Sequence, residues 1–482
     1  MVIGMKHNTK RRAISGLLAV IVSVGALSGC TSSKTAGQIE PMEVEKSPAI
    51  SFDIIGGKDV MPIGAYYIPY SSIYSYNGND LPDYISDEFY AKIADSGINL
   101  LMHSVTDYSD APKLVEKNLD LGAKYNIGVL VDDASITGQA GQETISKEDI
   151  TTRLAKYMNH PGFAGLYVTD EPTTEYTYTI YNENNTVEKY GTLSKMLNDE
   201  VGIFCYTNAF HSGGSDKEKA VYERYIEDIY NTMHPQYLSF DRYIFDKTHA
   251  KSMRNFFYDL EIMRKVSQKY NVPFWTYIAA GSQWNDNQTR FDSETPYYPD
   301  EGQFDWSVNV ALSFGAQGVQ YFPLIQPHFF AWAESTEFDF ERNGIFGAWG
   351  NKTQWYYYAQ DMNKHIAAID EVLMNSVNKG VIASGEQAKK DTSYAETAIM
   401  DGTAWRELAS VDGDSLIGCF NYQGKTALYV TNYSYEYAQK VELKFNDKYN
   451  FKVVQNAETK QYTGKGITLD MYAGDGVLIV FE

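Results

Sequence analysis

Short strand-like runs alternate with longer amphipathic runs along residues 60–375. The strand-like runs are rich in β-branched and aromatic residues, and there are eight of them, at residues 61–69, 98–105, 127–133, 163–171, 202–210, 237–245, 273–281 and 318–324. Between them, apolar residues recur three to four positions apart with charged residues on the other face, as at residues 87–97, 111–126, 219–233 and 251–271. Eight strands, each followed by a helix or a gap of helical length, predict a (β/α)₈ barrel over residues 51–376.

Two further features of the pattern bear on the fold. An open doubly wound sheet also arises from such alternation, but no glycine-rich phosphate turn follows the strand at residues 61–69. Beyond residue 376 the helical period disappears, and short alternating strands follow one another with turn residues between them. This pattern predicts an antiparallel β-sandwich over residues 377–482. We expect the sandwich to brace the barrel, with glycan binding as the alternative role.

The amino-terminal residues indicate a compartment. A basic stretch precedes an apolar run and the tetrapeptide "LSGC", which is the order of a secretory signal peptide. The tetrapeptide resembles the lipobox of bacterial lipoproteins, and this resemblance implies cleavage before Cys30 and lipidation of its sulfur. A short transmembrane anchor is the alternative, although the apolar run is shorter than the roughly 20 residues that a spanning helix needs. We expect a signal peptide over residues 1–29, a tether over residues 30–50, and an extracytoplasmic protein lipid-anchored to a bacterial cell membrane.

Composition narrows the classes of function. The net charge of −21 argues against a nucleic-acid partner, because few cations are left to neutralise phosphates. Tyrosine occurs 39 times, and its flat face with a hydrogen-bonding rim suits sugar rings as well as ordinary cores. Cys205 and Cys419 lie in apolar, strand-like contexts, so we expect buried thiols rather than a disulfide. The histidines show no ligand spacing, and we expect no metal and no other cofactor.

Polar and aromatic residues collect where the predicted strands end. In a (β/α)₈ barrel the carboxyl ends of the strands form one bowl that holds the chemistry. The residues at or just beyond these ends are His103, Asp132, Asp133, Asp170, Glu171, Asn208, His211, Asp241, Arg242, Tyr243, Tyr277, Trp284 and Tyr321. Because they come from separate parts of the chain and meet on one face, we expect a functional site there.

Asp170 and Glu171 are the central candidates. They end the apolar run "GFAGLYVTDEP", and a proline follows them. Burial and the neighbouring negative charge would raise the pKa of Glu171, as a general acid that works at neutral pH requires. Capping of a turn begun by Pro172 is the alternative role for either carboxylate.

The segment "HPGFAGLYVTDEP", residues 160–172, resembles the "HP-x-x-x-G-Y-x-x-x-DEP" segment of (β/α)₈ glycoside hydrolases. The likeness of layout extends over residues 60–482, and it implies cleavage of a glycosidic bond with Glu171 as the general acid/base. In the large retaining clan of such enzymes, strand 4 ends on Asn-Glu and strand 7 on a nucleophilic Glu. Here Asp170 stands at the Asn position, and no carboxylate follows strand 7 before Asp286.

Two other mechanisms match these residues in part. Hexosaminidases that use the acetamido group of their substrate carry an Asp-Glu pair after strand 4. That resemblance implies that Asp170 orients the acetamido group while Glu171 is the acid/base. Alternatively Asp241 is the second carboxylate, and a separation of about 5–5.5 Å would then indicate retention and about 6.5–9.5 Å inversion. Pairing of Asp241 with Arg242 or with a helix end is the structural alternative, and the sequence leaves both open.

The sequence as a whole predicts a surface-anchored glycoside hydrolase that acts on an oligo- or polysaccharide. Glu171, Asp170 and Asp241 are the expected catalytic residues. The expected sugar contacts are His103, Asp132, Asn208, Arg242, Tyr243, Tyr277, Trp284 and Tyr321, and the long segments after strands 7 and 8 add Trp332 and Trp349 as candidates. One rival is a glycan-binding lipoprotein on the same barrel without turnover. The other is a structural or adhesion lipoprotein, which predicts no deep bowl.

Overall fold

The computed structural model describes residues 50–69, 75–76, 79–80, 82–102, 111–177, 181–245, 250–281, 297–325, 342–394 and 404–482. Within them, eight parallel strands form one sheet in the order β7-β6-β5-β4-β1-β10-β9-β8. The strands are β1 (Ile63–Tyr66), β4 (Leu100–Met102), β5 (Gly128–Val131), β6 (Phe163–Asp170), β7 (Cys205–Asn208), β8 (Leu238–Asp241), β9 (Phe274–Ala279) and β10 (Val319–Phe322). The two ends of this order also meet, because the N–H of Ala209 after β7 donates to the carbonyl oxygen of Ser239 in β8 at 2.8 Å. The sheet is a closed barrel, and the predicted fold is confirmed.

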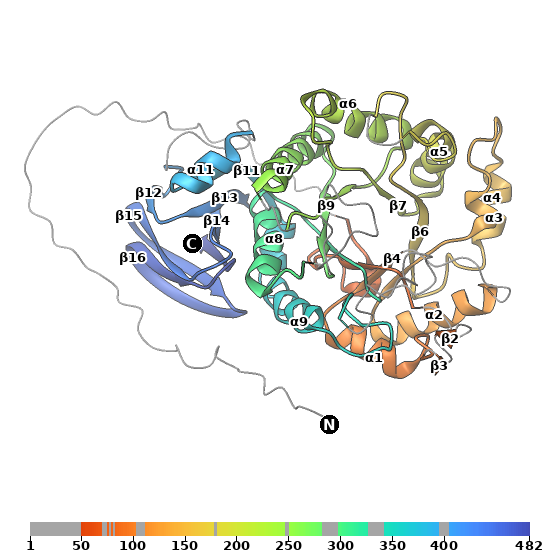
Figure 1. The fold of residues 1–482 in the computed structure, drawn as a ribbon, viewed down its shortest axis with the longest axis horizontal. Helices are drawn as coiled ribbons and strands as arrows, with labels where there is room; N and C mark the ends of the chain where they lie inside the picture. Colours follow the sequence, from red (N-terminus) through yellow and green to blue (C-terminus); the bar gives the residue numbers. More distant parts are fainter. Residues whose placement is uncertain are drawn as a thin grey trace, which may run out of the picture.

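Helices surround the barrel (Figure 1). The helices of the described residues are α1 (Asp87–Asp95), α2 (Ala111–Tyr125), α3 (Ala134–Thr137), α4 (Lys147–Leu154), α5 (Val187–Lys195), α6 (Asp216–Met233), α7 (Ala250–Tyr270), α8 (Glu301–Ser313), α9 (Gln354–Ile366), α10 (Asp370–Met374) and α11 (Glu386–Asp391). Side-chain caps fix several starts: Ser215 and Glu218 form a capping box at α6, and Asp300 and Gln303 form another at α8. A small hairpin of β2 (Ser75–Tyr76) and β3 (Asn79–Asp80) follows β1.

Alternate strand residues fill the barrel. The inward side chains form one buried cluster with a large aromatic share, which includes Tyr66, Leu100, Leu130, Tyr206, Tyr237, Trp275 and Tyr277. Their neighbours along the strands pack outward against the helices, among them Leu101, Val129, Cys205 and Ile278. Successive side chains of a strand point to opposite faces. The last inward position of each strand therefore faces the bowl.

The C-terminal residues form a second, antiparallel unit. Its strands are β11 (Ser376–Ser384), β12 (Leu408–Asp412), β13 (Ser415–Tyr422), β14 (Lys425–Asn432), β15 (Gln439–Gln455), β16 (Glu458–Met471) and β17 (Gly476–Phe481). A register shift between Lys444 and Tyr449 interrupts the long β15–β16 hairpin. Residues from both halves of the hairpin join one apolar cluster with β13, β14 and β17. The predicted sandwich is thus confirmed, with its layers joined through this hairpin.

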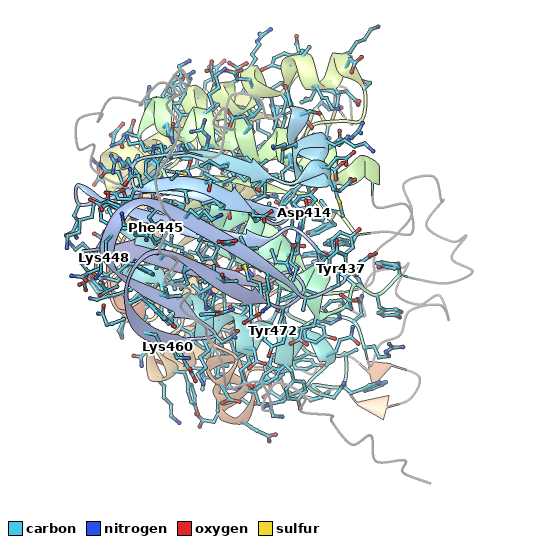
Figure 2. The ribbon with its side chains drawn as sticks, turned by 90° about the vertical axis from the view of Figure 1, so that its left-hand side faces the viewer. Asp414, Tyr437, Phe445, Lys448, Lys460 and Tyr472 are labelled. Carbon is cyan, nitrogen blue, oxygen red and sulfur yellow. The ribbon has the colours of Figure 1, made fainter. Side chains whose placement is uncertain are left out.

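The outer face of β15 and β16 is charged. Figure 2 views this unit from outside, with Tyr437 and Tyr472 toward one end of the sheet and Lys448 toward the other. Lysines there lie close to carboxylates, as in Lys440–Asp470 at 3.6 Å. Exposed pairs of this kind contribute little to stability.

Helix α8 joins the two units. Nearly all its residues from Gln303 onward are buried, on the barrel side and on the sandwich side alike. Asn309 donates from Nδ2 to the carbonyl oxygen of Gly474 at 2.8 Å, and its Oδ1 accepts from the hydroxyl of Tyr429 at 2.6 Å. The indole N–H of Trp306 donates to the carbonyl oxygen of Tyr433 at 2.8 Å. The sandwich therefore braces the barrel through a hydrogen-bonded, fully packed helix.

Residues 1–49 lie outside the described residues. The predicted signal peptide and Cys30 fall there, as does all of the predicted tether except residue 50. Among the described helices, none combines the length and the apolar composition needed to cross a membrane.

Candidate active site

Three adjacent strands bring carboxylates to the mouth of the barrel. Strand β6 ends on Asp170, which lies in register with Asn208, the last residue of β7. Strand β8 closes the barrel against β7 and ends on Asp241. Glu171 directly follows β6. The structure thus brings the three expected catalytic residues together at the carboxyl end of the barrel.

The backbone of Glu171 is strained. Its φ is +48°, a left-handed conformation that non-glycine residues seldom adopt and that collects at functional sites. Its N–H donates to the carbonyl oxygen of Asn208 at 2.8 Å. The side chain of Asn185 donates to the carbonyl oxygens of Asp170 at 2.7 Å and of Glu171 at 3.2 Å. These hydrogen bonds hold the backbone turn after β6, in which Glu171 departs from the extended strand conformation.

Glu171 and Asp241 are close enough to influence each other's pKa. Their side chains are hydrogen-bonded, with Glu171 donating and Asp241 accepting. Burial first, and then the charges of Asp241 and Asp170, raise the pKa of Glu171 well above its ordinary value. Burial also raises the pKa of Asp241, although nearby His211 and a hydrogen bond from Asn208 oppose that shift. The raised pKa of Glu171 favours retention of a proton by this pair at neutral pH.

Asp170 has different neighbours. Its carboxylate accepts hydrogen bonds from the hydroxyls of Tyr66 at 2.9 Å and of Tyr206 at 3.3 Å. Burial and the charge of Asp241 raise the pKa of Asp170 to about 7, while these hydroxyls and Asn208 pull in the opposite direction. A carboxylate held by several donors remains ionised more readily than its neighbour Glu171. Asp170 is thus suited to stabilising positive charge.

Asn208 connects the carboxylates to the barrel interior. Its Nδ2 donates to Asp241 at 3.1 Å, and its Oδ1 accepts from the hydroxyl of Ser239 at 2.7 Å. Gln320 donates in turn to the oxygen of that hydroxyl at 2.7 Å. Sequence reasoning missed Tyr66, Tyr206, Asn185, Ser239 and Gln320. All except Asn185 occupy inward positions of strands, and that alternation was the signal available for finding them.

The two aspartates after β5 have separate roles. Asp133 caps α3 by accepting from the N–H of Ser135 at 2.9 Å, and it also binds Lys156 and the hydroxyl of Tyr157, each at 2.8 Å. Burial and the charge of Asp133 raise the pKa of Asp132 to about 7. The charge of Asp132 contributes to the raised pKa of Tyr167, whose side chain faces inward. Asp132 therefore lies near the bowl, while Asp133 is structural.

Three other expected sugar contacts, Tyr243, Arg242 and Tyr277, lie at or near the mouth of the barrel. Tyr243 is half-buried near the three carboxylates, and its ring stacks on Phe322 at a centroid distance of 5.8 Å. Arg242 is buried and ion-paired with Asp259. Its main role is therefore structural rather than contact with a substrate. Tyr277 lies inside the barrel, where its hydroxyl is 2.6 Å from that of Tyr206.

Tyr321 lies away from the bowl. It points outward from β10, and its hydroxyl donates to Asn363 on α9 at 2.6 Å. Its ring stacks on Phe304 of α8. The prediction of a sugar contact at Tyr321 is therefore corrected: in β10 it is Gln320 that faces inward.

Some predictions fall where no structure is described. His103, Trp284 and Trp332 lie outside the described residues, whereas Trp349 is within them and half-buried. Cys205 and Cys419 are buried and unpaired with each other. Over the described ranges, no group of three or more histidine, cysteine, aspartate or glutamate side chains is arranged to hold a metal ion.

Comparisons with known proteins give only distant likenesses. No protein-family model matches the chain, and no curated protein does. A glucosidase from Croceicoccus marinus is similar with a TM-score of 0.42 at 10% identity, over 90% of this chain and 98% of that one.

Two further solved structures show the same level of similarity. An acarbose-bound α-amylase from Geobacillus thermoleovorans has a TM-score of 0.43 at 9% identity, over 88% of this chain and 99% of that one. A GH99 endo-α-mannosidase from Bacteroides thetaiotaomicron has a TM-score of 0.38 at 13% identity, over 63% and 96%. Likeness at this level says nothing about the reaction, which has to be inferred from the site itself.

Proposed function

We propose that this protein is a glycoside hydrolase that cleaves a glycosidic bond in an oligo- or polysaccharide. The observation that carries the proposal is the position of Glu171, which has a strained backbone and lies beside Asp241 at the mouth of a closed barrel, where burial and that carboxylate raise its pKa. Protonation of a leaving sugar oxygen needs a carboxylic acid that keeps its proton at neutral pH. Glu171 is partly exposed to solvent, so a substrate in the bowl can reach it.

In the proposed mechanism Glu171 donates its proton to the glycosidic oxygen while the bond from that oxygen to the anomeric carbon breaks. The electron pair of the bond leaves with the oxygen, and the carboxylate of Asp170 stabilises the positive charge that develops on the sugar ring. Glu171, now ionised, takes a proton from the water that attacks the anomeric carbon. The protons balance, and Glu171 returns to its starting state.

Asp241 acts through Glu171 as a positioning residue. Its carboxylate accepts the proton of Glu171 in a hydrogen bond and raises the pKa of that group. A carboxylate engaged with the general acid in this way is poorly placed to attack the anomeric carbon or to activate a water on the opposite face of the sugar ring. We therefore assign Asp241 neither the nucleophilic nor the water-activating role.

Product release from a broad panel of glycans tests the proposal. Glu171→Gln is expected to lower kcat by about 10²–10⁴-fold, the usual contribution of a general acid. Glu175→Gln, the same change at an exposed position in the same loop, leaves kcat unchanged. Asp241→Asn moves the alkaline limb of the pH profile to lower pH, because Glu171 then loses its proton more easily.

Two outcomes would count against the proposal. Equal rates for the wild type and Glu171→Gln would place the chemistry elsewhere. Glycan binding without turnover by either protein would make this a binding protein on a barrel scaffold.

We also propose that the protein is lipid-anchored outside the cytoplasm of a bacterium. The support is the order of basic stretch, apolar run and "LSGC" that ends on Cys30. Cell fractionation tests it: the wild type is expected with the membranes, and Cys30→Ala is expected to lose the lipid. Equal membrane association of both proteins would refute the anchor.

A further inference from the structure

The rim of the bowl continues onto the sandwich. Helix α8 follows the carboxyl end of β9 in chain order, so it begins at the end of the barrel that carries the carboxylates. Two sandwich loops rest on its first turn. A Cβ on Gly302 would clash with the carbonyl oxygen of Tyr435, and one on Gly474 would clash with the carbonyl oxygen of Gly302. The loops at residues 433–437 and 472–475 are therefore docked at the rim.

Packed rings lie between the site and these loops. Tyr243 and Phe245 are two and four residues beyond Asp241 in the chain. Phe245 meets Tyr435 of the first loop edge to face, with ring centroids 4.9 Å apart. Tyr435 also packs against Trp306 of α8 at 6.1 Å. Ring packing therefore connects the segment after Asp241 with the first sandwich loop.

One buried side-chain amide binds the backbone of two tyrosines in these loops. Asn432 is fully buried, and its Nδ2 donates to the carbonyl oxygens of Tyr437 at 3.1 Å and of Tyr472 at 2.5 Å. Tyr437 precedes β15 and Tyr472 follows β16, at the hairpin end where Gln439 pairs with Met471. Both tyrosines thus leave the sandwich from one anchored point, at the end of the sheet away from Lys448 (Figure 2).

Tyr437 differs from the rest of the sandwich surface, and Tyr472 lies close to it in the fold. Tyr437 has 54% of its surface exposed, more than any other large apolar side chain in the described ranges. Tyr472 is half-buried, and exposed Glu436 lies beside Tyr437 in the chain. An exposed aromatic ring can stack on a sugar ring, and a neighbouring carboxylate can accept hydrogen bonds from its hydroxyls.

We propose that Tyr437 and Tyr472 form a second glycan-binding surface, which holds a distal part of the same polysaccharide chain that is cut at Glu171. This inference rests on the proposed function for the location of the cut, but not for the binding. The first turn of α8 touches Tyr435 and Gly474, each two residues from one of these tyrosines, so a chain that leaves the bowl along this turn would reach them. The preferred substrate is accordingly a polymer rather than a short oligosaccharide.

Affinity electrophoresis measures the binding in isolation from cleavage. The probes are soluble β-glucan, xylan, galactomannan, starch and arabinogalactan, and the parent protein is full-length Glu171→Gln, which holds polymer without cutting it. Adding Tyr437→Ala, alone or with Tyr472→Ala, is expected to weaken binding of the retained polysaccharide about five- to tenfold, as the loss of an aromatic contact should. Tyr357→Ala removes a tyrosine of similar exposure from α9 and is expected to have no effect.

Kinetics separate this inference from the proposed function. In the otherwise wild-type enzyme, Tyr437→Ala is expected to lower kcat/KM for the polymer by the same factor and to leave kcat/KM for a trisaccharide of the same linkage unchanged. If the wild type cleaves nothing but binding still depends on Tyr437, the hydrolase proposal fails and this surface stands. Unchanged affinity in Tyr437→Ala, or no retention of the parent by any of the five polysaccharides, would overturn the surface.

Discussion

Asp170 and Glu171 are neighbours in the chain, yet the barrel gives them different partners. Tyrosine hydroxyls and an amide surround Asp170, and these donors favour its charged form. Glu171 meets another carboxylate, which favours its protonated form. Environments that push the pKa values of paired carboxyl groups apart are how enzymes assign an acid and a stabiliser to chemically similar side chains.

Removing the hydroxyl of Tyr66 should change the acid limb of the pH profile. The pKa of Asp170 is about 7, so kcat/KM should rise with pH through that region as Asp170 ionises. Tyr66→Phe deletes a donor to the charged form, which raises the pKa further and moves the limb up by about one pH unit. Tyr167→Phe is the comparison, because the hydroxyl of Tyr167 lies 3.1 Å from that of Tyr66. An acid limb that stays in place in Tyr66→Phe would show that Asp170 does not set it.

Glu171 should lower the stability of the protein at neutral pH. Its pKa in the folded state lies above its ordinary value, so the folded state loses stability as the pH rises beyond about 4.3. Glu171→Gln keeps a donor to Asp241 but cannot ionise. We expect the variant to be more stable than the wild type by about 1–3 kcal/mol at pH 7 and equally stable at pH 4. Thermal unfolding at the two pH values measures this, and equal stability at pH 7 would contradict it.

At the scale of elements, the turn after β6 depends on one amide. Asn185 binds the carbonyl oxygens of Asp170 and Glu171 and accepts from the hydroxyl of Thr169 at 2.6 Å. Asn185→Ala should release the strained Glu171 backbone, lower kcat at least tenfold and destabilise the protein by about 1–2 kcal/mol. Exposed Asn184→Ala, one residue earlier, is the control. Unfolding curves read beside kcat separate the two effects, and an unchanged kcat in Asn185→Ala would exclude a positioning role.

The sequence predicted elements better than side-chain directions. Eight apolar runs separated by amphipathic ones predicted the barrel, because parallel strands buried on both faces read as continuous apolar segments. In a strand of four residues such as β10, an error of one position exchanges the inward-facing residues with the outward-facing ones. Tyr321 was expected to contact a sugar, but its side chain points outward from the strand, toward α9.

Contacts between residues far apart in the chain explain why the sequence left other roles in the site open. Arg242 binds Asp259 on α7, and Glu171 meets Asp241 across two strands. No local pattern connects residues so far apart in the chain. The closing of the barrel is what brings them together, so the sequence placed Asp241 among the candidates but left its role open.

At the scale of the whole molecule, Asn309 joins the barrel and the sandwich. It is buried and bonded to Gly474 and Tyr429 of the sandwich. Asn309→Ala removes a donor to the carbonyl oxygen of Gly474 and an acceptor for the hydroxyl of Tyr429, and it should destabilise both units together by about 2–4 kcal/mol. Ser307→Ala on the same helix is the control, because its hydroxyl donates within the helix, to the carbonyl oxygen of Gln303 at 2.9 Å. Urea unfolding followed by far- and near-ultraviolet circular dichroism should show one shared transition, and a separate loss of the sandwich would contradict this.

The burial of α8 on both sides also bears on how such a protein evolves. Many secreted enzymes gain and lose accessory domains as modules, because the junction between them is a polar linker with few contacts. Here helix α8 of the barrel ring is itself part of the junction. A gene rearrangement that removed residues 376–482 would expose that helix to water. We therefore expect barrel and sandwich to be inherited as a single unit, with diversification confined to the loops at the rim.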